Sequence, residues 1–235
     1  MSTLKLWPVV LLCSAVGCSR GEASPKPGGP ATSATSSASN TSASSTTQGS
    51  DPRALAADRG RVLGAESAPV WLLIVSDFQC PWCKMWHDST FPAIKREYVD
   101  AGKVRVAFLN FPLGIHANAW PSAITAMCAS AQGRFWETQD RLFETQKRWE
   151  KLAEPRPFLD SLAIASGIDP IQLRACTSKS ALQDLVASDQ TRANKAGAET
   201  TPTFFIGGAK IEGAQPIKLF RHVIDSVLAS VTKGK

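Results

Sequence analysis

Two cysteines separated by two residues stand in the stretch SDFQCPWCKMWHDST, from Ser76 to Thr90, directly after the apolar run VWLLIV. An uninterrupted apolar run of this length predicts a β-strand that is covered on both faces, here Val70–Ser76. The residues after the cysteines predict a helix, so Cys80 and Cys83 stand where a strand passes into a helix. Two thiols at this spacing can form a disulfide, bind a metal ion or pack as small apolar side chains.

The start of the predicted helix gives the two cysteines different roles. Unsatisfied N–H groups and the positive end of the helix dipole favour a thiolate at Cys80, at or just before the first turn. Cys80 is therefore the predicted nucleophile, and Cys83, one turn further on, can close or resolve a disulfide with it. Pro81 suits an early helical position, where a missing N–H costs no hydrogen bond. Trp82 offers a broad apolar surface beside the sulfur.

Strands and helices alternate around this stretch. Residues 84–102 predict helix with a kink or break at Pro92, and KVRVAFLNFPL predicts a second strand parallel to the first. Residues of about 115–198 predict a helical insert, in which Gln132-Gly133 separates two helices. TPTFFIGG and AKIEG predict a strand pair joined by a Gly-Gly turn. The last predicted helix has one apolar face, formed by Ile217, Phe220, Val223, Ile224, Val227 and Leu228.

The N-terminus predicts export. Residues 1–17 carry one lysine and a short apolar segment, too short to remain in a bilayer, as in a signal peptide. The segment from Ala15 to Cys18 resembles a bacterial lipobox, in which the signal is cut before the cysteine that carries the lipid, although Ala15 stands where leucine is usual. Ordinary secretion with cleavage near Cys18 is the alternative, and Cys13 fits less well as a lipid site because two bulky leucines precede it.

The next segment predicts a tether. Residues 18–52 are rich in Ser, Thr, Ala and Pro and have almost no large apolar side chain, so they cannot bury enough surface to offset their ordering entropy. Residues 53–235 are long enough for one folded domain. A lipid on Cys18 would then hold this domain at a membrane of the bacterial cell envelope, facing the periplasm.

Charge gives no support for nucleic-acid binding. The chain has 26 basic and 20 acidic side chains, and they are interspersed without a basic block. Signatures of phosphate loops, dinucleotide-binding turns and serine nucleophiles are also absent from the sequence.

Four motifs in order resemble a known family: FQCPWC preceded by Asp77, FPL with His116 shortly after it, CASAQGRFWE, and TTPTFFIGG. Together they are similar to the DsbA-like branch of the thioredoxin-fold thiol-disulfide oxidoreductases, over residues of about 61–231. The resemblance implies an α/β thioredoxin fold with an inserted helical domain and a redox-active Cys80–Cys83 pair. It also implies a cis peptide bond between Thr201 and Pro202 facing the pair, with Thr201 offering backbone hydrogen bonds to the substrate chain.

Two departures from the family pattern concern the redox site. Ile74 stands where relatives often carry a buried glutamate that helps to move the resolving cysteine's proton, and Asp77 is the candidate substitute in this proton relay. Trp82 stands where strongly oxidising members carry a histidine that could help stabilise the thiolate. We therefore expect a potential below the value of about −120 mV of the strongest oxidants.

Two further cysteines, Cys128 and Cys176, lie in the predicted insert, and similar cysteines recur in this branch. A disulfide between them would contribute about 4 kcal/mol to stability in an oxidising compartment by the chain-entropy model. Two separate buried thiols, packed as small apolar side chains, are the alternative.

These features predict an exported monomer without a cofactor that exchanges disulfides with cysteine-containing envelope proteins and is reset by an unidentified redox partner. Dimerisation usually accompanies isomerase activity in this superfamily, and the chain shows no dimerisation module, so we favour a monomeric dithiol oxidase or a general dithiol-disulfide exchanger. A tethered disulfide reductase is an alternative, because oxidases and reductases share these motifs. One alternative is copper or zinc handling by Cys80, Cys83 and His87, although no second cluster offers a fourth ligand and no metal is assigned to the site. Another is a tethered binding protein that uses its peptide groove without redox turnover.

Overall fold

The computed structural model describes residues 51–178 and 180–233. The predictions for the signal peptide, for Cys18 and for nearly all of the tether lie outside these residues. Helix α1 (Pro52–Gly60) begins one residue before the predicted domain boundary, and Asp51 caps it by accepting a hydrogen bond from the main-chain N–H of Arg53. Neither α1 nor the short strand after it was predicted from the sequence.

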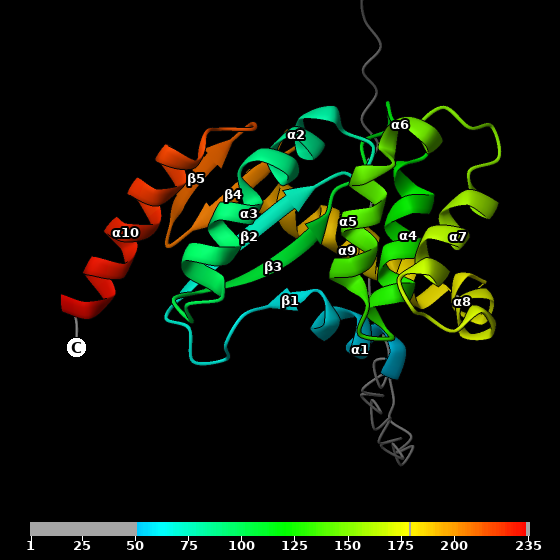
Figure 1. The fold of residues 1–235 in the computed structure, drawn as a ribbon, viewed down its shortest axis with the longest axis horizontal. Coiled ribbons are helices and arrows are strands. Elements are labelled where there is room, and N and C mark those ends of the chain that lie inside the picture. The colour runs from blue at the N-terminus through cyan, green and yellow to red at the C-terminus, as the bar shows by residue number, and fades with distance from the viewer. Residues whose placement is uncertain (1–50, 179, 234–235) are drawn as a thin grey trace, which may run out of the picture. The chain divides into compact units, whose positions relative to one another are not determined.

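A five-stranded mixed sheet forms the centre of the fold, in the order β1-β3-β2-β4-β5 (Figure 1). Strands β2 (Val70–Ser76) and β3 (Val104–Asn110) pair in parallel, as predicted. Strand β4 (Thr203–Ile206) runs antiparallel to β2, and β5 (Ala209–Glu212) is its antiparallel partner beyond a Gly-Gly turn. Strand β1 (Val62–Leu63) pairs with the outer side of β3.

The crossover from β2 to β3 contains the helix that follows Cys80. Helix α2 (Pro81–Ser89) is followed by α3 (Phe91–Ile94) and by a π-helical turn, η1 (Lys95–Val99). The predicted break at Pro92 is confirmed, because α2 ends at Ser89 and Pro92 lies in the first turn of α3. A proline is tolerated there since the first helical N–H groups have no partner within the helix.

Within the described residues, six helices lie between β3 and β4, where the sequence predicts the insert. They are α4 (Ala119–Ser130), α5 (Phe135–Glu144), α6 (Gln146–Trp149), α7 (Arg156–Ala165), α8 (Pro170–Thr177) and α9 (Ser180–Lys195). In Figure 1 helices α4 to α8 gather beside one end of the sheet. Helix α10 (Ile217–Lys233) follows β5. This arrangement confirms the predicted α/β thioredoxin fold with a helical insert.

The two faces of the sheet are covered by different helices. Trp86 of α2 packs against Phe204 of β4 and Phe220 of α10, with ring centroids 4.4 and 5.6 Å apart. On the opposite face Val75 of β2 packs with Ala193 near the C-terminal end of α9. Because β2 is covered on both faces, its apolar side chains are nearly continuous, as the sequence predicted.

The disulfide implied by the family resemblance is present in the insert. Cys128 of α4 and Cys176 of α8 are bonded with an S–S distance of 2.04 Å, and both are buried. The bond joins two helices that are 48 residues apart in sequence. In the part of the chain that the structure describes, no helix has the length and apolar character needed to cross a membrane.

Candidate active site

The two cysteines of the CPWC sequence lie at the beginning of α2. Cys80 is the N-cap residue, with an extended backbone, and Pro81 occupies the first helical turn. A main-chain hydrogen bond from Cys80 N–H to the Asp77 carbonyl closes the tight turn that leads from β2 into the helix. Cys83 lies one turn further, fully inside the protein, and both cysteines are free thiols in this structure.

The two thiols differ in acidity because their environments differ. A hydrogen bond from the Cys83 thiol is the largest cause that lowers the pKa of Cys80, to about 6, and the backbone N–H groups of Trp82 and Cys83 add to it against the effect of burial. Burial and the neighbouring Cys80 sulfur raise the pKa of Cys83 well above its ordinary value. The site therefore holds one sulfur as a thiolate at neutral pH and the other as a thiol.

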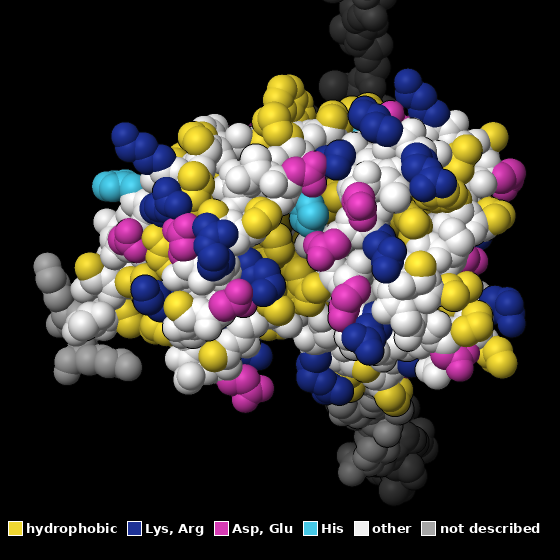
Figure 2. Space-filling view, in the orientation of Figure 1, with side chains coloured by type: hydrophobic (Ala, Val, Ile, Leu, Met, Phe, Trp, Pro, Cys, Tyr) yellow, Lys and Arg dark blue, Asp and Glu magenta, His cyan; other side chains and the backbone are white. Residues whose placement is uncertain are grey.

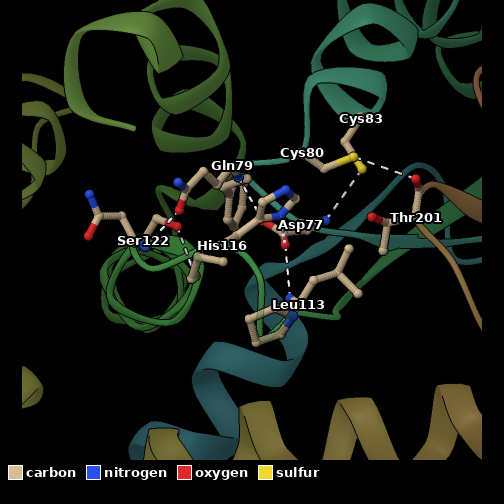
Figure 3. Close-up of polar contacts among 12 residues, drawn as sticks. Asp77, Gln79, Cys80, Cys83, Leu113, His116, Ser122 and Thr201 are labelled. Carbon is tan, nitrogen blue, oxygen red and sulfur yellow. Dashed lines mark hydrogen bonds and ion pairs between the residues drawn. The ribbon is translucent and has the colours of Figure 1, made fainter. Parts of the chain in front are cut away.

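The loop before β4 faces this pair from the other side. The peptide bond between Thr201 and Pro202 is cis, and the Cys80 sulfur lies 3.5 Å from the Thr201 carbonyl oxygen, to which the thiol can donate (Figure 3). The Thr201 side chain is buried, and its hydroxyl oxygen finds no partner among the described residues. The structure thus brings together the cysteine pair and the proline loop that the sequence placed about 120 residues apart.

A cavity of about 330 Å³ opens beside the Cys80 sulfur. Its walls come from the start of α2, from the loop between β3 and α4, and from the loop before β4: Cys80, Pro81, Trp82, Leu113, Ile115, His116, Thr200 and Thr201. The side chains of Trp82 and Ile115 are exposed, at 58% and 84%. Figure 2 shows hydrophobic side chains gathered over α2 at the edge of the molecule, while acidic and basic groups are interspersed elsewhere on this face.

A buried carboxylate lies behind this cavity. The Asp77 side chain is 0% exposed, and its oxygens accept hydrogen bonds from Gln79 N–H at 2.7 Å, Leu113 N–H at 2.9 Å and His116 Nδ1 at 2.7 Å. The Asp77 main-chain N–H points at the Cys83 sulfur, 3.5 Å away. Ile74, at the position of the family glutamate, is a buried β2 residue and supplies no acidic group.

The structure corrects the interpretation of one histidine. From the sequence, His116 is predicted only as part of a motif and otherwise as a helix-surface or packing residue. Instead it lies in the loop before α4, contacts Asp77 and lines the cavity with Cys80. Its proximity could not be inferred from sequence spacing, because the contact joins residues 39 positions apart in two different loops.

The helical insert also supports the active-site turn through amide side chains that were not predicted from the sequence. Gln146, at the start of α6, is 0% exposed and donates to the carbonyl oxygens of Phe78 and Cys80 at 2.7 and 3.0 Å. Gln79 donates to the carbonyl of Glu150 and accepts from Asn118 N–H. The turn that carries Cys80 is therefore held by the insert as well as by the sheet.

His87, the third residue of the candidate metal site, already has a partner for each of its ring nitrogens. Both ring nitrogens of His87 contact carboxylates, Nδ1 that of Asp88 at 3.0 Å and Nε2 that of Asp140 at 2.8 Å. Among residues 51–178 and 180–233, no group of three or more His, Cys, Asp or Glu side chains has an arrangement suited to a metal ion.

A cysteine pair at a helix N-terminus, opposite a cis-proline loop on a thioredoxin sheet, defines the class of thiol-disulfide oxidoreductases. The family model described as Thioredoxin matches residues 56–226. The chain belongs to this family, in its DsbA-like branch, and it is a thiol-disulfide oxidoreductase.

Three similar proteins illustrate the relationship. The probable disulfide bond formation protein D of Bacillus anthracis is 29% identical over 149 residues, which cover 62% of this chain and 69% of the relative. The structure of oxidised BdbD from Bacillus subtilis is 25% identical, with a TM-score of 0.66, and covers 73% of this chain and 94% of that chain. The structure of α-DsbA1 from Wolbachia pipientis is 24% identical, with a TM-score of 0.67 over 74% of this chain and 93% of that chain, and shows the shared fold.

Proposed function

We propose that this protein is an exported dithiol oxidase, which transfers the disulfide of Cys80 and Cys83 to cysteine-containing proteins of the bacterial cell envelope. The observation that carries the proposal is the position of Cys80 at the N-terminus of α2, where the Cys83 thiol and backbone N–H groups lower its pKa to about 6. A stable thiolate in the reduced pair favours reduction of the pair, and a pair that is readily reduced oxidises its substrates.

The first half of the transfer forms a mixed disulfide. A substrate thiolate attacks the Cys80 sulfur of the oxidised pair, so that a substrate–Cys80 bond forms and the Cys80–Cys83 bond breaks. The electron pair of the broken bond goes to the Cys83 sulfur. Burial raises the pKa of Cys83, so this sulfur takes up a proton from solvent. In this proposal the loop of Thr201 and Pro202 holds the substrate backbone, and the Thr201 carbonyl oxygen, 3.5 Å from the Cys80 sulfur, supports that role.

The second half releases the product. A second substrate thiolate attacks the substrate sulfur of the mixed disulfide, and Cys80 leaves as a thiolate, which its low pKa favours. The substrate has then lost two electrons, and the reduced pair has gained them. A separate redox partner must remove these electrons before the next cycle.

The N-terminal sequence and the relatives support the proposed cellular setting. Residues 1–17 have the pattern of an export signal, Cys18 is the candidate lipid site, and residues 18–52 would link the anchor to the domain. The Bacillus anthracis relative is named a probable disulfide bond formation protein. We infer a lipid-anchored monomer that faces the periplasm and binds no nucleic acid.

The reduction potential of the soluble domain tests the direction of transfer. Equilibration of Cys80–Cys83 with glutathione should give a value above about −180 mV and below about −120 mV, the value of the strongest oxidants. The same domain should oxidise a reduced peptide that contains two cysteines, and a Cys80→Ser variant should not. A potential below about −250 mV would support a tethered reductase instead. For the anchor, a Cys18→Ser variant of the full chain should lose membrane association in cell fractions.

A further inference from the structure

We propose that His116, oriented by the buried carboxylate of Asp77, is the base that removes the proton from the substrate thiol as it approaches Cys80. This inference rests on the proposed function, because it assigns the base for the first half of the transfer. Asp77 acts through His116 and is a positioning residue, whereas His116 would touch the reacting thiol.

The contacts of Asp77 fix both the position and the tautomer of the histidine. Main-chain N–H groups of Gln79 and Leu113 hold the carboxylate, which has no exposed surface. An oxygen held in this way accepts the Nδ1–H of His116 at 2.7 Å. In the neutral ring the proton then sits on Nδ1, and Nε2 keeps a lone pair that can accept a proton.

The free nitrogen of His116 is available to a substrate. The side chain is 16% exposed, and Nε2 has no hydrogen-bond partner among the described residues. His116 and Cys80 line the same cavity of about 330 Å³. In Figure 3 the imidazole ring lies beside Asp77 on the side of Cys80, with its second nitrogen directed away from the carboxylate.

The surroundings of the cavity offer few other acid–base groups. Of the residues that line it, Cys80 and His116 are the titratable ones, and Asp77 faces the ring from the β2–α2 turn. The wall from the loop before β4 is formed by two threonines, which are neutral. The other two positions considered from the sequence, Ile74 and Trp82, carry no charge.

The proposed step is balanced in protons and electrons. The substrate S–H proton passes to Nε2, the resulting thiolate attacks Cys80, and the Cys80–Cys83 bond breaks as described above. The imidazolium then releases its proton to solvent through the open cavity. A base is useful because an ordinary cysteine thiol, with a pKa of about 8.5, is only a few per cent ionised at neutral pH.

Stopped-flow kinetics can isolate this step. Oxidised protein is mixed with a single-cysteine peptide in excess, and the rate constant for reduction of the Cys80–Cys83 bond is measured between pH 5.5 and 9 by tryptophan fluorescence. A His116→Gln variant should be slower by about tenfold at pH 6.5, and it should approach the wild-type rate at pH 9, where the peptide thiol ionises without help. An Asp77→Asn variant should show the same pH-dependent loss.

A matched control variant and a chemical rescue distinguish a catalytic role of His116 from a structural one. His87 is also paired with carboxylates but does not line the cavity, so a His87→Gln variant should keep the wild-type pH profile. A His116→Ala variant should regain several-fold of its lost rate at pH 6.5 when imidazole is added, because the vacated site can accept a free base.

The possible outcomes are distinct. This inference alone is wrong if the wild-type protein is active, the rate constant of His116→Gln falls by the same factor or not at all at every pH, and imidazole gives no rescue. A wild-type protein that leaves peptide thiols reduced at every pH overturns the proposed function and this inference with it.

Discussion

The reduction potential of the Cys80–Cys83 pair should change its dependence on pH at about pH 6. Below the pKa of Cys80, reduction of the disulfide takes up two protons for two electrons. Above it, reduction takes up one proton, because Cys80 stays a thiolate and only Cys83, whose pKa is raised, is protonated. The potential should therefore fall by about 60 mV per pH unit below pH 6 and by about 30 mV per pH unit above it.

The lowered pKa also sets the size of the oxidising contribution. At pH 7, lowering the pKa of a thiol from 9.0 to about 6 makes the thiolate its main form. This shifts the redox equilibrium toward the reduced pair by about tenfold. This corresponds to about 1.4 kcal/mol, or about 30 mV, in favour of the reduced pair. It is an upper value, because the sulfur faces an open cavity where solvent screens its charge. The folded-state pKa is depressed, so the contribution is complete above the ordinary thiol pKa and is lost as the pH falls through about 6.

The assay is redox titration at several values of pH. The domain is equilibrated with glutathione or dithiothreitol buffers between pH 5 and 9, quenched with acid, alkylated, and separated by mass. Thiolate absorbance near 240 nm gives the pKa of Cys80 independently. In a Cys83→Ala variant this pKa should rise, because the hydrogen bond from the Cys83 thiol is its largest lowering cause. A single slope of about 60 mV per unit up to pH 8.5, or of about 30 mV from pH 5 upward, would refute the reasoning.

Four further variants test other parts of the structure. Cys83→Ser should accumulate a substrate–Cys80 mixed disulfide on non-reducing gels when it is mixed with a disulfide-containing substrate, because Cys80 attacks that disulfide and no Cys83 thiol remains to displace the substrate. Replacing Cys128 and Cys176 with alanine should cost up to about 4 kcal/mol of unfolding free energy in denaturant titrations, as expected for the 48-residue separation. Asp189→Asn should lower the Tm by about 10 °C in calorimetry, because it disrupts the buried ion pair between Asp189 of α9 and Arg61, and removing one partner of such a pair costs about 3 kcal/mol. Trp82→His should raise the potential by about 30 mV for each unit by which it lowers the pKa of Cys80; no change in pKa or potential would contradict this expectation.

The parts of the fold that could be predicted from the sequence are those in which one segment carries a recognisable pattern of its own. The apolar run Val70–Ser76, the proline at 92 and the two glycines between β4 and β5 each reflect the backbone of their own segment. The turn glycines adopt positive φ angles, and Gly208 at 91° shows why that position suits glycine. Four motifs in order then placed these elements in a known architecture.

The unpredicted parts depend on contacts between distant segments. Strand β1 has two residues, too few for a periodic pattern, and the helix before it has a polar composition. A buried cluster anchors this region: Asp189 of α9 accepts hydrogen bonds from Arg61 and from both the main-chain and side-chain N–H groups of Asn110. No spacing rule links residues 61, 110 and 189, so the cluster becomes apparent only in three dimensions.

The same distinction applies to the active site. The helix N-terminus predicts which cysteine is acidic, because this effect depends on the sequence beside Cys80. The partner of Asp77 was not predicted, because His116 belongs to a loop after another strand. A histidine in such a loop gives no local sign of whether it faces a solvent-filled cavity or the core.

The helical insert contributes to the chemistry of Cys80 by fixing its geometry. The Cys80 carbonyl accepts a hydrogen bond from Lys84 N–H within α2 and a second one from Gln146 of α6. Gln146 also holds the Phe78 carbonyl, so both ends of the turn before α2 are tied to the same buried amide. The hydrogen bonds that lower the pKa of Cys80 depend on how the first turn of α2 is placed beneath its sulfur. Because the insert fixes that turn with a neutral amide, it can hold the thiolate in position without adding a charge to the site.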